Sequence, residues 1–141
     1  LYMSTSYMKP KMLAIDIKSS EPKIAWQYEK NVPAISSPIL VDEKLYFVSD
    51  KGGIVTCLDA NTGSMVWRDR IGGNHNASPT YANGMLLFHS LEGVTSVLRP
   101  GEALDVVHRN ELKGSHYATA AISEQACYLR TDTALYRIER P

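Results

Sequence analysis

The sequence is poor in cysteine, tryptophan and phenylalanine, and it has no excess of either charge. Only two of its 141 residues are cysteine, two are tryptophan and two are phenylalanine. Lysine and arginine together number 15, as do aspartate and glutamate, so the formal net charge is zero. A neutral chain lacks the strongly basic surface that attracts nucleic acids and anionic membranes, which argues against both as the main partner.

Long apolar runs are also missing. No stretch approaches the roughly 20 apolar residues that a membrane-spanning helix needs, so no transmembrane segment is expected. No signal peptide is visible, and the chain begins with Leu1 rather than Met. Because the first residues already look like a strand, we interpret the sequence as a fragment or a processed piece of a longer chain.

The two cysteines, Cys57 and Cys127, are expected to be buried free thiols. They fall on strands two repeats apart in the pattern described below, which is too far for a disulfide bond. Without a disulfide framework, cysteine usage does not identify the cellular compartment.

The sequence does contain a clear hairpin signal, which runs from Gly53 to Trp67. Residues 54–58 are mostly β-branched or apolar, as suits a pleated strand. Asp59 can accept hydrogen bonds from the backbone N–H groups that follow it, and Gly63 can adopt a positive φ at no steric cost. The Asp-x-x-Thr-Gly-x-x-x-Trp pattern therefore predicts a hairpin whose second strand carries a buried tryptophan.

The same features recur along the chain at a nearly constant interval. Ser37-Pro38 returns as Ser78-Pro79, and Trp26 corresponds to Trp67 at the same spacing. A period of roughly 40 residues with several short strands per repeat is typical of a β-propeller, in which each repeat forms one four-stranded blade. Strands that are apolar on both faces, such as residues 45–48, fit a blade packed between two neighbours. A β-sandwich would bury one face of each sheet but needs no such period.

We therefore predict an all-β fold, a β-propeller segment of about four antiparallel four-stranded blades that make half of an eight-bladed ring. The whole chain forms this single segment, with blades at approximately residues 1–30, 31–71, 72–112 and 113–141. The first blade is expected to lack its first strand, and the fourth its last. The predicted strands are residues 1–6, 12–17, 23–28, 35–41, 44–49, 53–59, 65–71, 77–82, 85–90, 94–99, 103–109, 117–122, 126–131 and 134–139.

The complete motif resembles the PQQ-type β-propeller repeat. That repeat carries Ala-x-Asp-x-x-Thr-Gly-x-x-x-Trp, and here Cys57 stands at its alanine position, ahead of Asp59, Thr62, Gly63 and Trp67. The family includes quinoprotein dehydrogenases and the outer-membrane β-barrel assembly lipoprotein. The resemblance implies the propeller fold and an exported bacterial protein, periplasmic or otherwise extracytoplasmic. It does not imply a cofactor, because the repeat also occurs in proteins that bind none.

The other repeats depart from this motif. The first has Asp16 and Trp26, with Lys18-Ser19-Ser20-Glu21-Pro22 in place of the Thr-Gly turn. In the third, Arg99 replaces the aspartate and His108 stands at the tryptophan position. WD40 repeats have a similar period, but neither tryptophan here is followed by aspartate.

An open half-ring would expose two apolar blade faces and unpaired strand edges, which favour association. We therefore expect a protein partner or a second copy of the chain to complete the ring. The alternative is that the remaining blades belong to a longer form of the same protein.

Two histidines are candidates for a ligand site at the rim of the central channel. His75 and His116 lie one period apart, in the connections that enter the third and fourth blades, so neighbouring blades should present them at equivalent positions. With the adjacent Asn76 and Tyr117 they form our candidate channel-rim set. Imidazole can bind metal, transfer protons or donate to an anion, although two histidines without a third ligand make a weak metal site. The alternative is a pair of solvated side chains with no ligand.

No catalytic group of residues stands out. His89 and His108 fall on predicted strands and are expected to be half-buried packing residues. The sequence defines no Ser-His-Asp set, no paired carboxylates and no glycine-rich phosphate loop. No catalytic residue and no metal ligand is therefore predicted.

For dehydrogenases of this family, the resemblance implies PQQ and a calcium ion in the channel. They are held there against a disulfide between adjacent cysteines, a stacking tryptophan and carboxylate ligands. This chain has no adjacent cysteines, and Trp26 and Trp67 lie at the structural motif position. We therefore expect no cofactor in this chain, since PQQ with calcium would need a complete ring. The leading hypothesis is a non-catalytic interaction scaffold, and the alternative is a fragment of a PQQ-dependent alcohol or sugar dehydrogenase.

Overall fold

The computed structural model describes residues 1–6, 8–18, 20–123 and 125–139. Within these residues there are fourteen β-strands in four antiparallel sheets, and no helix that could span a membrane. The prediction of an all-β partial propeller is confirmed. Ser19, in the predicted turn at 18–22, and residues 140–141, at the end of the fourth predicted blade, lie outside the described residues.

Each sheet consists of strands that are consecutive in sequence, and we call the sheets blades 1 to 4. Blade 1 contains β1 (Tyr2–Ser4), β2 (Met12–Asp16) and β3 (Lys23–Tyr28). Blade 2 contains β4 (Ile39–Val41), β5 (Lys44–Val48), β6 (Ile54–Asp59) and β7 (Met65–Arg70). Blade 3 contains β8 (Thr80–Ala82), β9 (Met85–His89), β10 (Val94–Leu98) and β11 (Val106–Glu111). Blade 4 contains β12 (Ala121–Ser123), β13 (Ala126–Arg130) and β14 (Leu135–Glu139).

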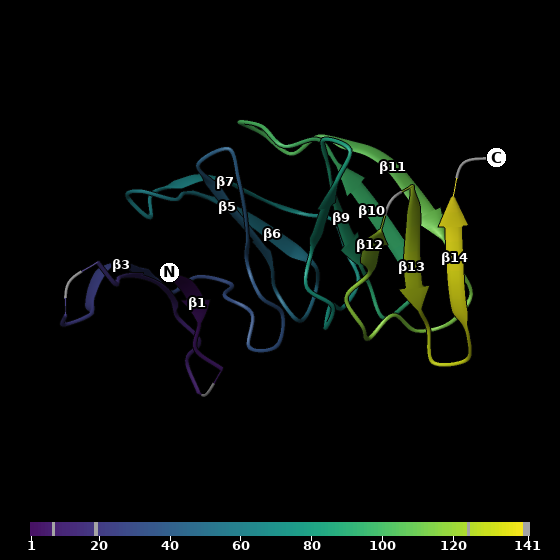
Figure 1. Cartoon of the computed structure of the whole chain (residues 1–141), viewed down its shortest axis with the longest axis horizontal. Coiled ribbons are helices and arrows are strands. Elements are labelled where there is room, and N and C mark those ends of the chain that lie inside the picture. The colour runs from purple at the N-terminus through teal and green to yellow at the C-terminus, as the bar shows by residue number, and fades with distance from the viewer. Residues whose placement is uncertain (7, 19, 124, 140–141) are drawn as a thin grey trace.

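The blades follow one another along the long axis of the molecule, from the N-terminus at one end to the C-terminus at the other (Figure 1). In each blade the strands pair in sequence order, and the first strands of blades 2 and 3, β4 and β8, contact each other. The succession of separate sheets, each meeting the next face to face, is the arrangement that the sequence period predicts.

The first strands of the complete blades are shorter than predicted. β4 begins at Ile39 and β8 at Thr80, directly after Pro38 and Pro79. A proline has no N–H to donate to a strand ladder. The residues before these prolines therefore do not pair within their own sheet, and they are free to bond to the neighbouring blade.

Packing on both faces of β5 is confirmed. Leu45 and Phe47 belong to a cluster shared with Met12 of blade 1, whereas Tyr46 and Val48 belong to a second cluster shared with blade 3. Successive residues of a strand point to opposite faces, so one strand supplies two cores. This is why the sequence of β5 is a continuous apolar run rather than an alternating one.

The hairpin at 53–67 forms as predicted. Asp59 Oδ1 accepts hydrogen bonds from Asn61 N at 3.0 Å, from Thr62 N at 2.8 Å and from the Thr62 hydroxyl at 2.9 Å. These bonds, chiefly those from Thr62, hold the pKa of Asp59 below its ordinary value. Gly63 has a φ of 72°, and a Cβ at this position would lie 2.6 Å from Cδ2 of Trp26. The glycine is therefore required both by the turn and by the tryptophan that lies over it.

Candidate functional site

The connections that enter blades 2, 3 and 4 are joined to one another by side-chain hydroxyls. Ser37 N donates to Ser78 Oγ at 2.9 Å, and Ser78 N donates to Thr119 Oγ1 at 3.0 Å. Each bond joins residues 41 positions apart, so it is one repeated bond between successive blades. We call Ser37, Ser78 and Thr119 the hydroxyl ladder. It lies at the entry to the first strands, which surround the centre of a propeller.

Carboxylates in the turns between the second and third strands of each blade hold the same connections. Each accepts a hydrogen bond from a backbone N–H: Asp50 from Ala34 at 2.8 Å, Glu92 from Asn74 at 3.0 Å and Asp132 from Ser115 at 2.9 Å. The bond from Asn74 holds the pKa of Glu92 below its ordinary value. The three carboxylates therefore cap the backbone of the connections that enter blades 2, 3 and 4.

His75 is buried, so the alternative of a solvated side chain is wrong for this residue. The residue is only 1 % exposed, and its ring lies between two carbonyl oxygens, with Nδ1 at 3.0 Å from His89 O and Nε2 at 2.9 Å from Gly72 O. A neutral ring can donate to only one of them at a time. The connection can turn the imidazole inward because Gly72 and Gly73 have φ of 83° and 76°. His75 thus links the connection to β9.

His116, one repeat later, is also fully buried, so the alternative of a solvated side chain is wrong here too. Unlike His75, it has no hydrogen-bond partner on either ring nitrogen among the described residues. Its ring packs edge-on against that of His89, with centroids 5.9 Å apart. His89 Nδ1 is bonded to Thr95 Oγ1 at 2.9 Å, but its Nε2 is unpartnered.

Burial lowers the pKa of both His89 and His116. At His89 the neighbouring His116 and His75 rings add to the effect, and the pKa falls to about 4. His89 was expected to be half-buried and is fully buried, whereas His108, expected to be half-buried, is exposed.

Tyr117, which follows His116, faces outward instead. Tyr117 is 58 % exposed, and Ile35, at the equivalent position in blade 2, is 60 % exposed. Asn76, between them in the repeat, is half-buried. Neighbouring residues of an extended segment point to opposite sides, which explains why burying the histidines exposes these positions. The exposed set combines an aliphatic, an amide and a phenol side chain, so it does not form a ring of one ligand chemistry.

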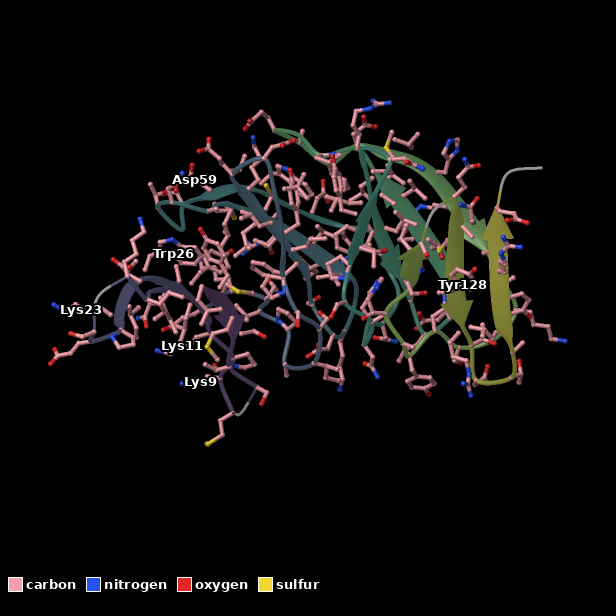
Figure 2. The ribbon with its side chains drawn as sticks, viewed as in Figure 1. Lys9, Lys11, Lys23, Trp26, Asp59 and Tyr128 are labelled. Carbon is pink, nitrogen blue, oxygen red and sulfur yellow. The ribbon has the colours of Figure 1, made fainter. Side chains whose placement is uncertain are left out.

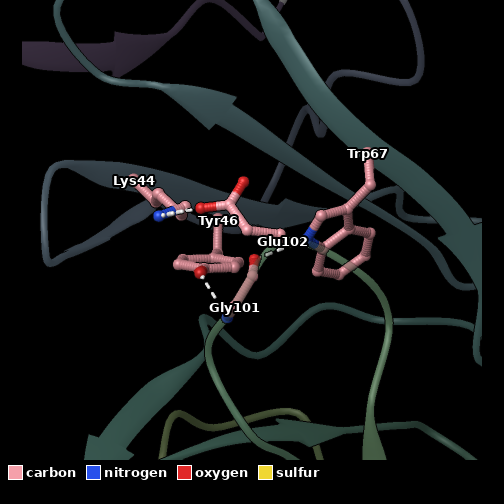
Figure 3. A network of polar contacts seen from close by, with 5 residues as sticks. All are labelled: Lys44, Tyr46, Trp67, Gly101 and Glu102. Atoms are coloured by element: carbon pink, nitrogen blue, oxygen red, sulfur yellow. Dashed lines mark hydrogen bonds and ion pairs between the residues drawn. The ribbon is translucent and has the colours of Figure 1, made fainter.

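A polar network around Gly101 closes the junction of blades 2 and 3 (Figure 3). Trp67 Nε1 donates to Gly101 O at 2.9 Å, and Gly101 N donates to Tyr46 Oη at 3.1 Å. At its edge, Lys44 Nζ and Glu102 Oε1 form an ion pair at 2.8 Å. Two side chains of one blade thus hold both backbone groups of one residue in the next. We call this arrangement the Trp clamp.

Cys57 lies in the middle of this clamp, since it pairs with Tyr46 on β5 and with Trp67 on β7. Burial raises the pKa of the Cys57 thiol to about 11 and also raises the pKa of Tyr46. A thiol with such a pKa is a poor nucleophile at neutral pH. The prediction of a buried free thiol is confirmed for Cys57, while Cys127 is free but only half-buried.

The junction of blades 1 and 2 has a clamp of the same design. Trp26 Nε1 donates to Ala60 O at 3.0 Å, and Tyr2 Oη donates to the same oxygen at 2.9 Å. Figure 2 shows Trp26 of blade 1 close to the turn that begins at Asp59. The first two junctions therefore use a tyrosine and a tryptophan against the same turn of the next blade.

The junction of blades 3 and 4 has no such clamp among the described residues. Leu87 pairs with Val97, which pairs with His108, in the row where Tyr46, Cys57 and Trp67 stand in blade 2. A groove of about 360 Å³ runs between the two blades instead, and Leu87, Val97, Cys127 and Ile138 are among the residues that line it.

The described residues do not supply the ligands that the PQQ-type resemblance implies. None of their His, Cys, Asp and Glu side chains gather into a group of three or more that could hold a metal ion. The cysteines are free and distant in sequence, and Trp26 and Trp67 are both engaged in clamps. Asp50, Glu92 and Asp132 each accept a hydrogen bond from a backbone N–H group.

Sequence reasoning missed the hydroxyl ladder and the Trp clamp as joints between blades. The spacing of Ser37, Ser78 and Thr119 was a usable signal, because a hydroxyl residue recurs twice at the repeat interval. The clamps gave a weaker signal, since the acceptors Ala60 and Gly101 differ and only their carbonyl groups matter.

The repeated blades, the hydroxyl ladder and the Trp clamps define a partial β-propeller of PQQ-type repeats. The family model described as outer membrane protein assembly factor BamB matches residues 11–134, and the chain belongs to that family. A search of curated proteins found no significant match.

Solved structures resemble the chain in fold. BamB from Moraxella catarrhalis matches with a TM-score of 0.75 and 14% identity, over 95% of this chain and 38% of that one. The quinohemoprotein alcohol dehydrogenase ADHIIG from Pseudomonas putida HK5 matches with a TM-score of 0.68 and 14% identity, over 91% of this chain and 26% of that one. A europium-containing methanol dehydrogenase matches with a TM-score of 0.67 and 18% identity, over 80% of this chain and 23% of that one. The chain thus spans less than two fifths of each of these structures.

Proposed function

We propose that the chain is a non-catalytic, extracytoplasmic interaction scaffold whose partners take part in outer membrane protein assembly. The family description points to that process. The observation that carries the proposal is that side chains suited to chemistry have structural tasks. His75 spans two carbonyl groups, Asp50 caps the backbone, and Trp67 clamps the next blade. The exposed surface therefore remains for binding other molecules, and we assign no catalytic role to these residues.

The exposed positions at the entries to the blades suit a protein partner. Ile35 and Tyr117 are both more than half exposed, although they are aliphatic and aromatic. Tyrosine offers a rigid apolar ring and a polar hydroxyl, and aromatic residues are enriched in protein interfaces. The outer faces of blades 1 and 4 offer further surface, which a protein partner, a second copy of the chain or further blades of a longer chain would cover.

The binding proposal is tested with the double variant Ile35→Ser, Tyr117→Ser and with a matched control, Met65→Ser. Met65 is 50 % exposed but lies on the outer strand β7. The immobilised chain is titrated with an outer membrane β-barrel protein kept unfolded in dilute urea, and separately with the purified assembly machinery. We expect the double variant to weaken binding to one of these at least about tenfold, since each lost anchor costs on the order of 1 kcal/mol or more. Equal affinity of the double variant and the control, or no binding at all, contradicts the proposal.

The proposal of a non-catalytic chain without a cofactor is tested separately. The purified chain is mixed with PQQ, calcium, a redox dye and a panel of primary alcohols and sugars. We expect no dye reduction and no saturable change in the PQQ spectrum. Turnover, or tight PQQ binding, would favour the alternative of a quinoprotein dehydrogenase fragment.

Native mass by light scattering separates the two ways of covering the open faces. A clean dimer indicates that a second copy covers them. A monomer that becomes larger only with the assembly machinery indicates a protein partner.

A further inference from the structure

We propose that the junction of blades 3 and 4 is an acid-sensitive joint, which the buried His89–His116 pair keeps closed only while both rings are neutral. The inference goes beyond the scaffold proposal and does not depend on it.

The geometry places the two rings at the contact between the blades. His89 ends β9 of blade 3, and His116 lies in the connection that leads into blade 4. Three of their four ring nitrogens have no partner among the described residues, and the rings meet edge-on with centroids 5.9 Å apart. A neutral ring leaves one N–H unbonded at most, whereas a protonated ring would bury a full charge with unbonded N–H groups. Protonation therefore costs far more in the closed joint than in water.

The neighbouring groups do not offset that cost. His75, in the connection before β8, opposes a positive charge on His89. Thr95 on β10 offers a neutral hydroxyl, and Asp132, in the turn after β13, favours a charge on His116 but is already bonded to Ser115 N at 2.9 Å.

Glu92, in the turn after β9, and Arg130, at the end of β13, also have partners. Glu92 is bonded to Asn74, and Arg130 donates to Thr131 O. Neither forms a hydrogen bond to the histidine rings, whose unpartnered nitrogens are noted above.

The direction of the pH effect follows from the lowered pKa values. His89 titrates at about 4 in the closed joint, against 6.5 ordinarily, so the open state binds protons more tightly. The contribution of His89 to closure is complete above about pH 6.5 and is lost as the pH falls towards 4. For this residue alone, closure weakens about thirtyfold between pH 7.5 and pH 5.

Opening should be confined to this joint. The junctions on either side of blade 2 are held by Trp26 on Ala60 and by Trp67 on Gly101. The junction of blades 3 and 4 has His108 at the tryptophan position and a groove of about 360 Å³. Acid should therefore release blade 4 while blades 1 to 3 stay packed.

Hydrogen exchange of the full chain at pH 7.5 and pH 5, corrected for intrinsic rates, tests this. We expect amide protection in β12, β13 and β14 to fall at least about tenfold, and protection in β5, β6 and β7 to hold. Fluorescence of Trp26 and Trp67 gives an internal control, because both report on the clamped junctions and should not change. Unchanged protection of blade 4, or equal loss in all blades, overturns the proposal.

Variants test whether the loss of protection in blade 4 at acid pH is due to His89 and His116. In His89→Asn with His116→Leu, the asparagine keeps a group for Thr95 and the leucine removes the unpartnered nitrogens, so blade 4 should be equally protected at both pH values. His108→Asn, at the exposed histidine, should keep the wild-type acid response. An acid response that survives in the double variant refutes the assignment.

If the double variant does not fold, the wild-type imidazole signals are titrated by NMR. We expect the pKa of His89 and the pKa of His116 both to lie below the ordinary value for histidine, and ordinary titration of both near 6.5 overturns the proposal.

Discussion

The junctions that follow blades 2 and 3 occupy equivalent places in the repeat, yet they are built differently. After blade 2, Trp67 and Tyr46 hold Gly101, and a hydrophobic cluster fills the space between the sheets. After blade 3, His108 replaces the tryptophan and a groove remains. The two junctions thus share one backbone arrangement. Their difference comes from a few side chains at fixed positions of the repeat.

The two buried histidines show the same contrast. His75 lies between the carbonyl oxygens of Gly72 and His89, whereas His116, at the equivalent position of the next repeat, has none of these bonds. One junction satisfies its imidazole and the other leaves it unpartnered in the interior, where an unpaired polar group is costly. The same residue type can therefore stabilise one repeat through its hydrogen bonds and destabilise the next, where those bonds are missing.

The largest expected effect is loss of the clamp in Trp67→Ala. Truncating a buried tryptophan typically costs about 3–5 kcal/mol, and here it also leaves Gly101 O without its donor. Urea unfolding should show this loss in the free energy of unfolding. His108→Ala is the matched control at the same repeat position, and because His108 is exposed we expect a change within about 0.5 kcal/mol. Equal effects of the two variants would remove the distinction between the junctions.

The next effect concerns Gly63→Ala, which sharpens the comparison at the first junction. The new Cβ would lie 2.6 Å from Trp26 Cδ2 at a φ of 72°, so both strain and displacement of the clamp are expected, at about 2–4 kcal/mol. Gly84→Ala has a similar φ of 77° but open space around it, and should cost only about 1 kcal/mol. Thermal unfolding of both variants separates the steric clash with Trp26, present only in Gly63→Ala, from the backbone strain that both variants share. Equal melting temperatures would refute the role of the contact between Gly63 and Trp26.

A smaller effect is expected for the hydroxyl ladder. Ser78→Ala removes the acceptor for Ser37 N and should cost about 1 kcal/mol. Ser123→Ala, on the exposed strand β12, serves as the control and should be neutral. Hydrogen exchange at the Ser37 amide is the direct measurement, and protection that persists in Ser78→Ala would show that the bond is not made in solution.

The smallest effect should come from the ion pair at the edge of the Trp clamp. Glu102→Gln removes the charge that pairs with Lys44 at 2.8 Å. Because Glu102 is exposed, we expect a small loss of stability at low salt that disappears at high salt. A loss that persists at high salt would mean that Glu102 acts through packing rather than charge.

The repeat made much of the fold predictable. All fourteen strands lie at or near their predicted ranges, because short strands and turn residues recur in each repeat and β5 is apolar on both faces. The errors occur at the entries to the blades. There, Pro38 and Pro79 end the ladder, and Ser37 bonds to another blade rather than to its own sheet.

The candidate site was less predictable. The recurrence of His75 and His116 correctly suggested equivalent places, but whether the imidazoles or their neighbours face outward depends on the path of the connection. Gly72 and Gly73 have positive φ ahead of the buried His75, and Gly114, with a φ of 114°, precedes the buried His116 and the exposed Tyr117. The spacing of residues does not predict whether the histidine or the residue after it is buried, since successive residues of an extended segment point to opposite sides and either can face inward.

The blade repeat, the order of strands in each sheet and the turn chemistry around Asp59 can all be derived from the sequence, because they depend on local propensity and periodicity. Which junctions are clamped, which histidine is hydrogen-bonded and which surface is exposed follow instead from the packing of the blades against one another. Those properties arise where blades meet, between residues far apart in the chain, such as Trp67 with Gly101 and Ser37 with Ser78. They depend on distances between side chains that no single repeat contains.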